Sequence, residues 1–291
     1  MIQAHFEVLN LIIQALTPYL KKGSIAEKDL YKISYLLDKF ILIMPYPNYS
    51  IIPTRLIRAS INSKIPNVGN NIIKEIKYLK YPPPENVLKF GRCNTINMSI
   101  LYGAFSKLTA TKELRPSIHE IVTFSEWEPS NEIPFKAFPI FFIDKDFDNV
   151  YNEISLDVKK LHKNYISEKS INEQKYYNLS MQFLSKCFSK EVDINNDFDY
   201  FMSSYISSKI FSNTLGNYDL ILYPSVEEKL GFTNMAFRPE VFDKRFILKE
   251  ATTDICLGVK GSDSKGIMFK QISNATHFDL KLGSIEWNNI L

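Results

Sequence analysis

Helix-like and strand-like patterns occupy separate blocks of this sequence, and this separation limits the possible folds more than any other feature. Near the amino terminus, apolar residues recur every three or four positions, as in an amphipathic helix; they are Ile2, Phe6, Leu9, Ile13, Leu16 and Leu20. Gly23 then ends this helix, and Ser24 with Glu27 predicts a capping box before a second apolar stripe that runs to Met44. We therefore expect a helical hairpin over residues 1–48, which packs on the rest of the protein or on a partner chain.

The remainder of the chain, residues 49–291, combines strand-like segments with one helical block. From Ser50 onward, short runs rich in Ile, Phe, Tyr and Val are broken by Pro and Asn, which predicts strands and loops. Helical spacing returns in an insertion at about residues 146–214. Further strands are predicted at Leu220–Tyr223, Phe246–Leu248 and Ile255–Val259, with a last strand at Ile267–Ile272. Strands, helices and then more strands favour an α+β fold over an alternating parallel fold.

Charge and cysteine content exclude several classes of protein. The chain has 35 basic and 32 acidic residues, a net charge of +3, so we expect no nucleic-acid partner and no anionic membrane partner. Apart from the amino terminus, the apolar run Phe138–Ile143 is far shorter than the ~20 residues that span a bilayer. The three scattered cysteines, Cys93, Cys187 and Cys256, form neither a disulfide framework nor a zinc set. Since the amino terminus also lacks a basic leader, we expect a cytoplasmic protein.

The common catalytic signatures are missing from the sequence. It contains no Gly-x-Gly-x-x-Gly and no Gly-Lys-Ser/Thr loop, so any phosphate must be bound by side chains. His119 and Glu120 begin like a zinc-protease motif, but Thr123 stands where the second histidine is needed. Cys93 has no histidine near it in the sequence, and no Gly-x-Ser-x-Gly is present. We expect no metal cofactor.

Three segments in a fixed order carry the most specific signal. They are Leu56–Ser60 (LIRAS), Phe90–Glu113 with Gly-Arg-Cys-Asn and Thr-Ala, and Tyr218–Ser225 with Tyr-Pro-Ser, continuing through Asn234 to Pro239. Together they resemble the RES-domain family, which is named for Arg, Glu and Ser and is similar in fold to the ADP-ribosyltransferases. The resemblance covers roughly residues 50–250. It implies an ADP-ribosyltransferase-like β-sheet core with flanking helices, and the helical hairpin lies outside it.

The resemblance assigns a site residue by residue. The matching positions are Arg58 for the first arginine, Arg92 and Asn94 for Gly-Arg-x-Asn, Tyr102 for the strand tyrosine, Glu113 for the glutamate after Thr-Ala, and Ser225 for the serine. Tyr102 and Glu113 are separated by the expected step of eleven residues. Arg55 competes with Arg58 for the first position. The interval from Arg58 to Arg92 is also longer than in compact members of the family.

Destruction of NAD+ by the toxin of a toxin–antitoxin pair is the activity that the resemblance implies. Cleavage of the nicotinamide–ribose bond builds positive charge on the ribose, which the carboxylate of Glu113 can stabilise. Guanidinium groups such as Arg58 and Arg92 match the pyrophosphate, and Tyr102 offers a face for nicotinamide to stack on. Ser225 is suited to a ribose hydroxyl. We expect a glycohydrolase or phosphorylase that uses NAD+ as substrate, with an antitoxin and a second copy of the chain as possible partners.

The sequence is also compatible with two other functions and with a purely structural interpretation of the same residues. The enzyme can instead transfer ADP-ribose to a protein, or the chain can be a non-catalytic binding module that keeps the fold. Structurally, each arginine can pair with a surface carboxylate and Tyr102 can be a core residue. Glu113 can be a solvated first-turn residue of a helix that Thr109 caps.

Overall fold

The computed structural model describes residues 2–45, 49–140, 153–193, 195–212, 216–225, 233–260 and 266–290. These residues form seven α-helices and ten β-strands, which confirms the α+β class. They belong to two compact units, each assembled from three segments of the chain. The first comprises Met1–Ile51, Pro83–Ile100 and Pro134–Arg238, and the second comprises Ile52–Pro82, Leu101–Ile133 and Pro239–Leu291. The predicted division at residue 48 remains a prediction about domains, and these units partition the chain differently.

The first unit is mostly helical. Its helices are α1 (Ile2–Leu16), α2 (Leu30–Ile43), α4 (Glu153–Ser167), α5 (Ile171–Ser189) and α6 (Phe201–Phe211). Its strands are β1 (Tyr49–Ile51), β5 (Phe135–Pro139), β6 (Leu220–Pro224) and β7 (Thr233–Phe237), in the order β1-β5-β6-β7. Only β5 and β6 pair in parallel among these strands. Every residue of β6 is buried, as expected for an uninterrupted apolar run in the middle of a sheet.

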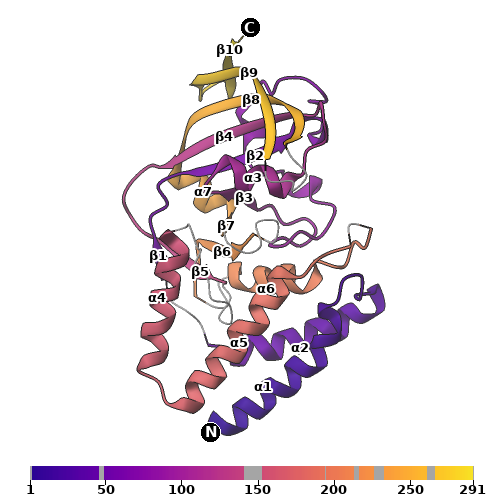
Figure 1. Cartoon of the computed structure of the whole chain (residues 1–291), viewed down its shortest axis with the longest axis vertical. Coiled ribbons are helices and arrows are strands. Elements are labelled where there is room, and N and C mark those ends of the chain that lie inside the picture. Colours follow the sequence, from indigo (N-terminus) through magenta and orange to yellow (C-terminus); the bar gives the residue numbers. More distant parts are fainter. Residues whose placement is uncertain are drawn as a thin grey trace. The chain divides into compact units, whose positions relative to one another are not determined.

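The predicted hairpin packs on the predicted helical block, as Figure 1 shows for α1, α2 and α5. Phe40 of α2 meets Phe183 of α5 edge to face, with ring centroids 4.8 Å apart. The Tyr176 hydroxyl donates a hydrogen bond to the carbonyl of Ile43, the last residue of α2. The prediction of a capping box at Ser24 and Glu27 was wrong. Ser24 Oγ donates to the Lys21 carbonyl, and α2 follows a 3-10 turn at Glu27–Asp29 without a side-chain cap. A backbone turn therefore replaces the predicted side-chain cap.

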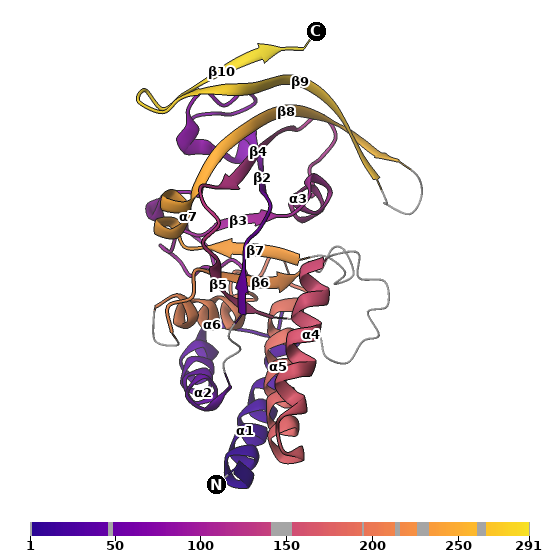
Figure 2. The same cartoon turned by 90° about the vertical axis from the view of Figure 1, so that its left-hand side faces the viewer.

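The second unit is a curved antiparallel sheet with two short helices. Its strands are β2 (Leu56–Ile61), β3 (Leu101–Ala104), β4 (Ile121–Pro129), β8 (Phe246–Lys260), β9 (Gly266–Asp279) and β10 (Ser284–Asn289). They lie in the order β3-β2-β4-β8-β9-β10, with helices α3 (Lys107–Leu114) and α7 (Pro239–Arg245). Two register shifts between β8 and β9 accompany the bend of these long strands in Figure 2.

Two strand predictions for the carboxyl-terminal region were wrong. The segments predicted at residues 246–248 and 255–259 belong to one strand, β8, and the predicted last strand is followed by β10. The apolar-run criterion divided β8 because its middle residues are polar, yet Thr253 is buried there. Thr253 pairs in register with Thr123 on β4 and Ser273 on β9, and the Thr123 and Thr253 hydroxyls lie 3.1 Å apart. Hydrogen bonding between strands makes a polar strand centre tolerable inside the unit.

The helical spacing predicted at about residues 146–214 is confirmed for α4, α5 and α6, while residues 141–152, which include Val150, lie outside the described residues. Helix α5 begins with a complete capping box, in which Ser170 Oγ accepts from Glu173 N and the Glu173 side chain accepts from Ser170 N. Within the described ranges, no helix has the length and apolar character that would let it cross a membrane.

Gly103 lets β2 and β3 approach closely, and its replacement by alanine is expected to destabilise the second unit. A Cβ atom at this position would lie 2.3 Å from Leu56 Cδ1 and 3.1 Å from the Ile57 carbonyl oxygen. Overpacking of this kind costs about 1–3 kcal/mol of unfolding free energy, measurable by denaturant titration. In a Leu56→Ala background the same change should cost clearly less, because its main clash is gone. Equal costs in both backgrounds would contradict this explanation.

Candidate functional site

Arg58 and Tyr102 lie on adjacent strands, β2 and β3, of the second unit. Arg58 Nη1 donates a long hydrogen bond of 3.5 Å to the Tyr102 carbonyl oxygen. The buried Nε atom of Arg58 has no hydrogen-bond partner, and no carboxylate in the described part of the chain forms an ion pair with this residue. Burial lowers the pKa of Arg58 from 12.5 to about 10, although the nearby Tyr102 phenol acts in the opposite direction. The guanidinium is therefore a partly buried cation for which the described residues supply no counter-ion.

Arg55 differs from Arg58 in both exposure and contacts. Its side chain is 50% exposed, and its Nη1 lies 4.0 Å from Glu126 Oε1 on β4. Its Nε donates a 3.1 Å hydrogen bond to the Phe105 carbonyl oxygen, just after β3. Since Arg55 already has a carboxylate and solvent nearby, Arg58 is the better candidate for binding an anion supplied from outside the chain.

Glu113 lies in the last turn of α3, the helix that directly follows β3, and it is exposed. The structural interpretation of Glu113, as a first-turn residue of a helix capped by Thr109, was wrong in two details. The cap of α3 is Ser106, whose Oγ accepts a 3.1 Å hydrogen bond from Thr109 N, so Thr109 is not the cap. Glu113 is also near the carboxyl end of the helix and not in its first turn. Leu114 packs against the cluster formed by Ile57, Ile61 and Phe124, which fixes the end of the helix on the sheet.

Arg92 belongs to the first unit, where its guanidinium binds the carboxyl-terminal end of α5. Nη1 donates to the Phe188 carbonyl oxygen, and Nη1 and Nη2 each lie 3.5 Å from the Lys190 carbonyl oxygen. The guanidinium carbon also lies 5.1 Å from the centre of the Tyr200 ring. A cation at the last carbonyls of a helix is stabilised by those carbonyls and by the helix dipole. These contacts give Arg92 a structural role without any ligand.

Asn94 and Ser225 are buried in the same unit. Asn94 Nδ2 donates to the carbonyl oxygens of Lys89, at 3.1 Å, and Thr95, at 3.2 Å, so this amide fixes its own loop. Ser225 directly follows β6 and is fully buried, and residues 226–232 after it lie outside the described residues. Of the six positions assigned by the resemblance, Arg58, Tyr102 and Glu113 thus belong to one compact unit, and Arg92, Asn94 and Ser225 to the other.

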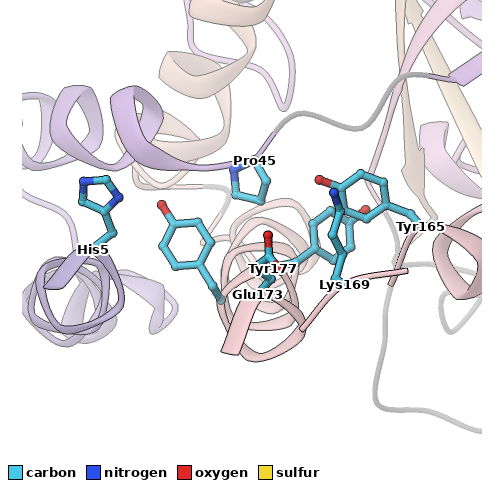
Figure 3. Close-up of a pocket in the computed structure, with 7 residues that line it drawn as sticks. His5, Pro45, Tyr165, Lys169, Glu173 and Tyr177 are labelled. Atoms are coloured by element: carbon cyan, nitrogen blue, oxygen red, sulfur yellow. The ribbon is translucent and has the colours of Figure 1, made fainter. Parts of the chain in front are cut away.

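A pocket in the first unit, with a volume of about 210 Å³ and shown in Figure 3, was not predicted from the sequence. Its walls come from three helices and the end of a fourth, and they are lined by His5, Pro45, Tyr165, Lys169, Glu173, Tyr176 and Tyr177. The only signal in the sequence was the run of aromatic residues in the helical block. Helical spacing alone does not show which of these rings leave a cavity when the helices pack.

The chain matches no protein-family model and no curated protein sequence.

Proposed function

We propose that this protein consumes NAD+ by cleaving the bond between nicotinamide and ribose, as a glycohydrolase or phosphorylase with an ADP-ribosyltransferase-like arrangement. The order of the Arg58, Arg92, Tyr102, Glu113 and Ser225 segments supports the proposal, since it resembles the RES-domain family. We further propose that it is the toxin of a toxin–antitoxin or defence system. An antitoxin protein and a second copy of the chain are the partners proposed with this role.

The structural observation that carries the proposal is the uncompensated guanidinium of Arg58 beside Tyr102. A partly buried cation without a counter-ion is costly, and a pyrophosphate would supply both the missing charge and acceptors for its N–H groups. We therefore assign the phosphate-binding role to Arg58 in preference to Arg55 and Arg92, both of which have partners within the chain. Asn94 and Ser225 are proposed as NAD+-binding residues on the basis of the resemblance alone.

Tyr102 and Glu113 are proposed for the chemical step. The Tyr102 ring would stack on nicotinamide, which positions the glycosidic bond. The Glu113 carboxylate would stabilise the positive charge that develops on the ribose as nicotinamide leaves. Water or phosphate would then capture the ribosyl cation and complete the reaction.

The direct test is to incubate the purified protein with NAD+, with and without phosphate, and to measure released nicotinamide. Release in both conditions indicates a glycohydrolase, and release that needs phosphate indicates a phosphorylase. Labelled ADP-ribose that becomes attached to a protein indicates a transferase. Absence of nicotinamide in every condition would contradict the proposal.

The two neighbouring arginines should differ sharply in this assay. We expect Arg58→Ala to lower kcat/KM for NAD+ by about 30- to 100-fold, because a hydrogen-bonded charge to the pyrophosphate is worth roughly 2–3 kcal/mol. The matched change Arg55→Ala should reduce it by less than about threefold, since an exposed ion pair contributes little. The opposite ranking would assign the phosphate to Arg55.

A further inference from the structure

We infer that the pocket in the first unit binds a small single-ring aromatic anion, such as an aryl carboxylate. The observations behind this inference are the aromatic walls of the pocket and the charge at its rim. The pocket lies within the first unit, and the inference does not depend on cleavage of NAD+.

The walls of the pocket are suited to a flat apolar ring. Tyr165 and Tyr177 face each other at a tilt, with ring centroids 4.7 Å apart, and Tyr177 also stacks on His162 at 5.3 Å. Tyr176 is held by the hydrogen bond from its hydroxyl to Ile43, so its ring is fixed before any ligand arrives. Rings that are already fixed lose little conformational entropy when they stack on a ligand.

The size of the pocket limits what it can hold. Its volume of about 210 Å³ is below the ~300–1,000 Å³ typical of sites for drug-sized ligands. A dinucleotide is therefore too large for it, and one aromatic ring with a small substituent is the appropriate class.

The rim of the pocket carries one basic and one acidic side chain, Lys169 and Glu173. Lys169 lies at the same end of the pocket as Tyr165, and His5 lies at the opposite end (Figure 3). The Lys169 ammonium is 5.1 Å from the centre of the Tyr165 ring and forms no ion pair with any carboxylate in the described ranges. It is therefore available to a carboxylate on a ring that enters beside Tyr165.

The acid at the rim, Glu173, is already engaged by the chain. Its Oε2 accepts hydrogen bonds from Ser170 N at 2.9 Å and Ser170 Oγ at 2.7 Å, which complete the capping box of α5. These hydrogen bonds, together with Lys169, lower the pKa of the Glu173 carboxyl. Because these hydrogen bonds and the start of α5 already stabilise the Glu173 charge, Lys169 is the charged rim residue that has no carboxylate at ion-pair distance within the described ranges.

Three probes that share a benzene ring and differ in charge test the inference on the full-length protein. Benzoate, benzamide and benzylammonium would be titrated separately by ligand-observed NMR to obtain dissociation constants. We expect benzoate to bind more tightly than benzamide, and benzylammonium to bind most weakly. Preference for benzylammonium, or no saturable binding of benzoate, would overturn the inference.

Two lysine variants locate the binding. Lys169→Gln should weaken benzoate about fivefold, the size expected for one partly exposed ion pair, and leave benzamide unchanged. Lys175→Gln, on the exposed surface of α5 and outside the pocket lining, should change neither. Tyr165→Ala, which removes a partly exposed wall, should weaken both probes. Equal effects of the two lysine variants on benzoate would overturn the inference.

Discussion

Replacing Asp199 with asparagine is expected to lower the unfolding free energy by about 3–5 kcal/mol, because it breaks a buried ion pair and leaves a buried cation. Asp199 Oδ1 lies 2.6 Å from Lys190 Nζ, and both side chains are almost completely buried. Asp199 Oδ2 also accepts from Gly23 N at 2.8 Å and Asp193 N at 2.7 Å. One carboxylate therefore joins the loop between α1 and α2 to the segment that follows α5.

Denaturant titration of three variants measures this effect. Asp197→Asn is the matched control, because its ion pair with Lys89 is exposed and should contribute less than about 1 kcal/mol. In the double variant Lys190→Gln with Asp199→Asn no buried charge remains, so it should be more stable than Asp199→Asn alone. If Asp199→Asn were no more harmful than Asp197→Asn, the ion pair would not be a stabilising element.

The same pair predicts how stability depends on pH. Burial by itself would raise the pKa of Asp199, but hydrogen bonds from Lys190, Asp193 and Gly23 outweigh it and the folded-state pKa lies below the usual value. The contribution of the ionised Asp199 carboxylate to the unfolding free energy is therefore fully present above the unfolded-state pKa of about 4. This contribution is lost as the pH falls through the lower folded-state pKa. The stability difference between the wild type and Asp199→Asn should shrink over that acidic range.

Glu113→Gln is expected to reduce the kcat for nicotinamide release by about 100- to 1,000-fold with little change in stability. The proposed carboxylate acts on charge that develops only in the transition state, and the amide that replaces it is neutral. Because Glu113 is exposed in the last turn of α3, the substitution disturbs no buried packing. Glu128→Gln is a suitable control, since Glu128 forms an exposed ion pair with Lys249 in the same unit.

The same variant separates the proposed enzyme from a non-catalytic binding module. One observation favours the module: Arg92 and Asn94, two positions of the resemblance, make internal contacts that explain them without NAD+. If cells that express the wild type lose NAD+ and cells that express Glu113→Gln do not, the enzyme is supported. Equal NAD+ levels and equal growth with both proteins would favour the module.

The types of the main elements could be predicted from the sequence because they depend on local periodicity. The apolar stripes of α1 and α2 and the uninterrupted run in β6 each lie within one short segment. The ends of helices and strands were less predictable where hydrogen bonds between distant parts of the chain decided how far the element extends. The buried hydroxyls of Thr123 and Thr253 lie far apart in the chain, and they make the centre of β8 a strand although its composition is polar.

The candidate site was predictable only as a set of residue types in order. The sequence determined by itself the α+β class, the helical hairpin and the positions of the arginines, Tyr102 and Glu113. Only the tertiary structure decided that Arg58 has no counter-ion among the described residues and that Arg92 binds the end of α5. It also decided that Asp199 pairs with Lys190 and accepts a hydrogen bond from Gly23, which lies 176 residues from Asp199. The physical reason is that burial, desolvation and pairing of a charge depend on residues distant in the sequence, whereas helical and strand periodicity depend on neighbours.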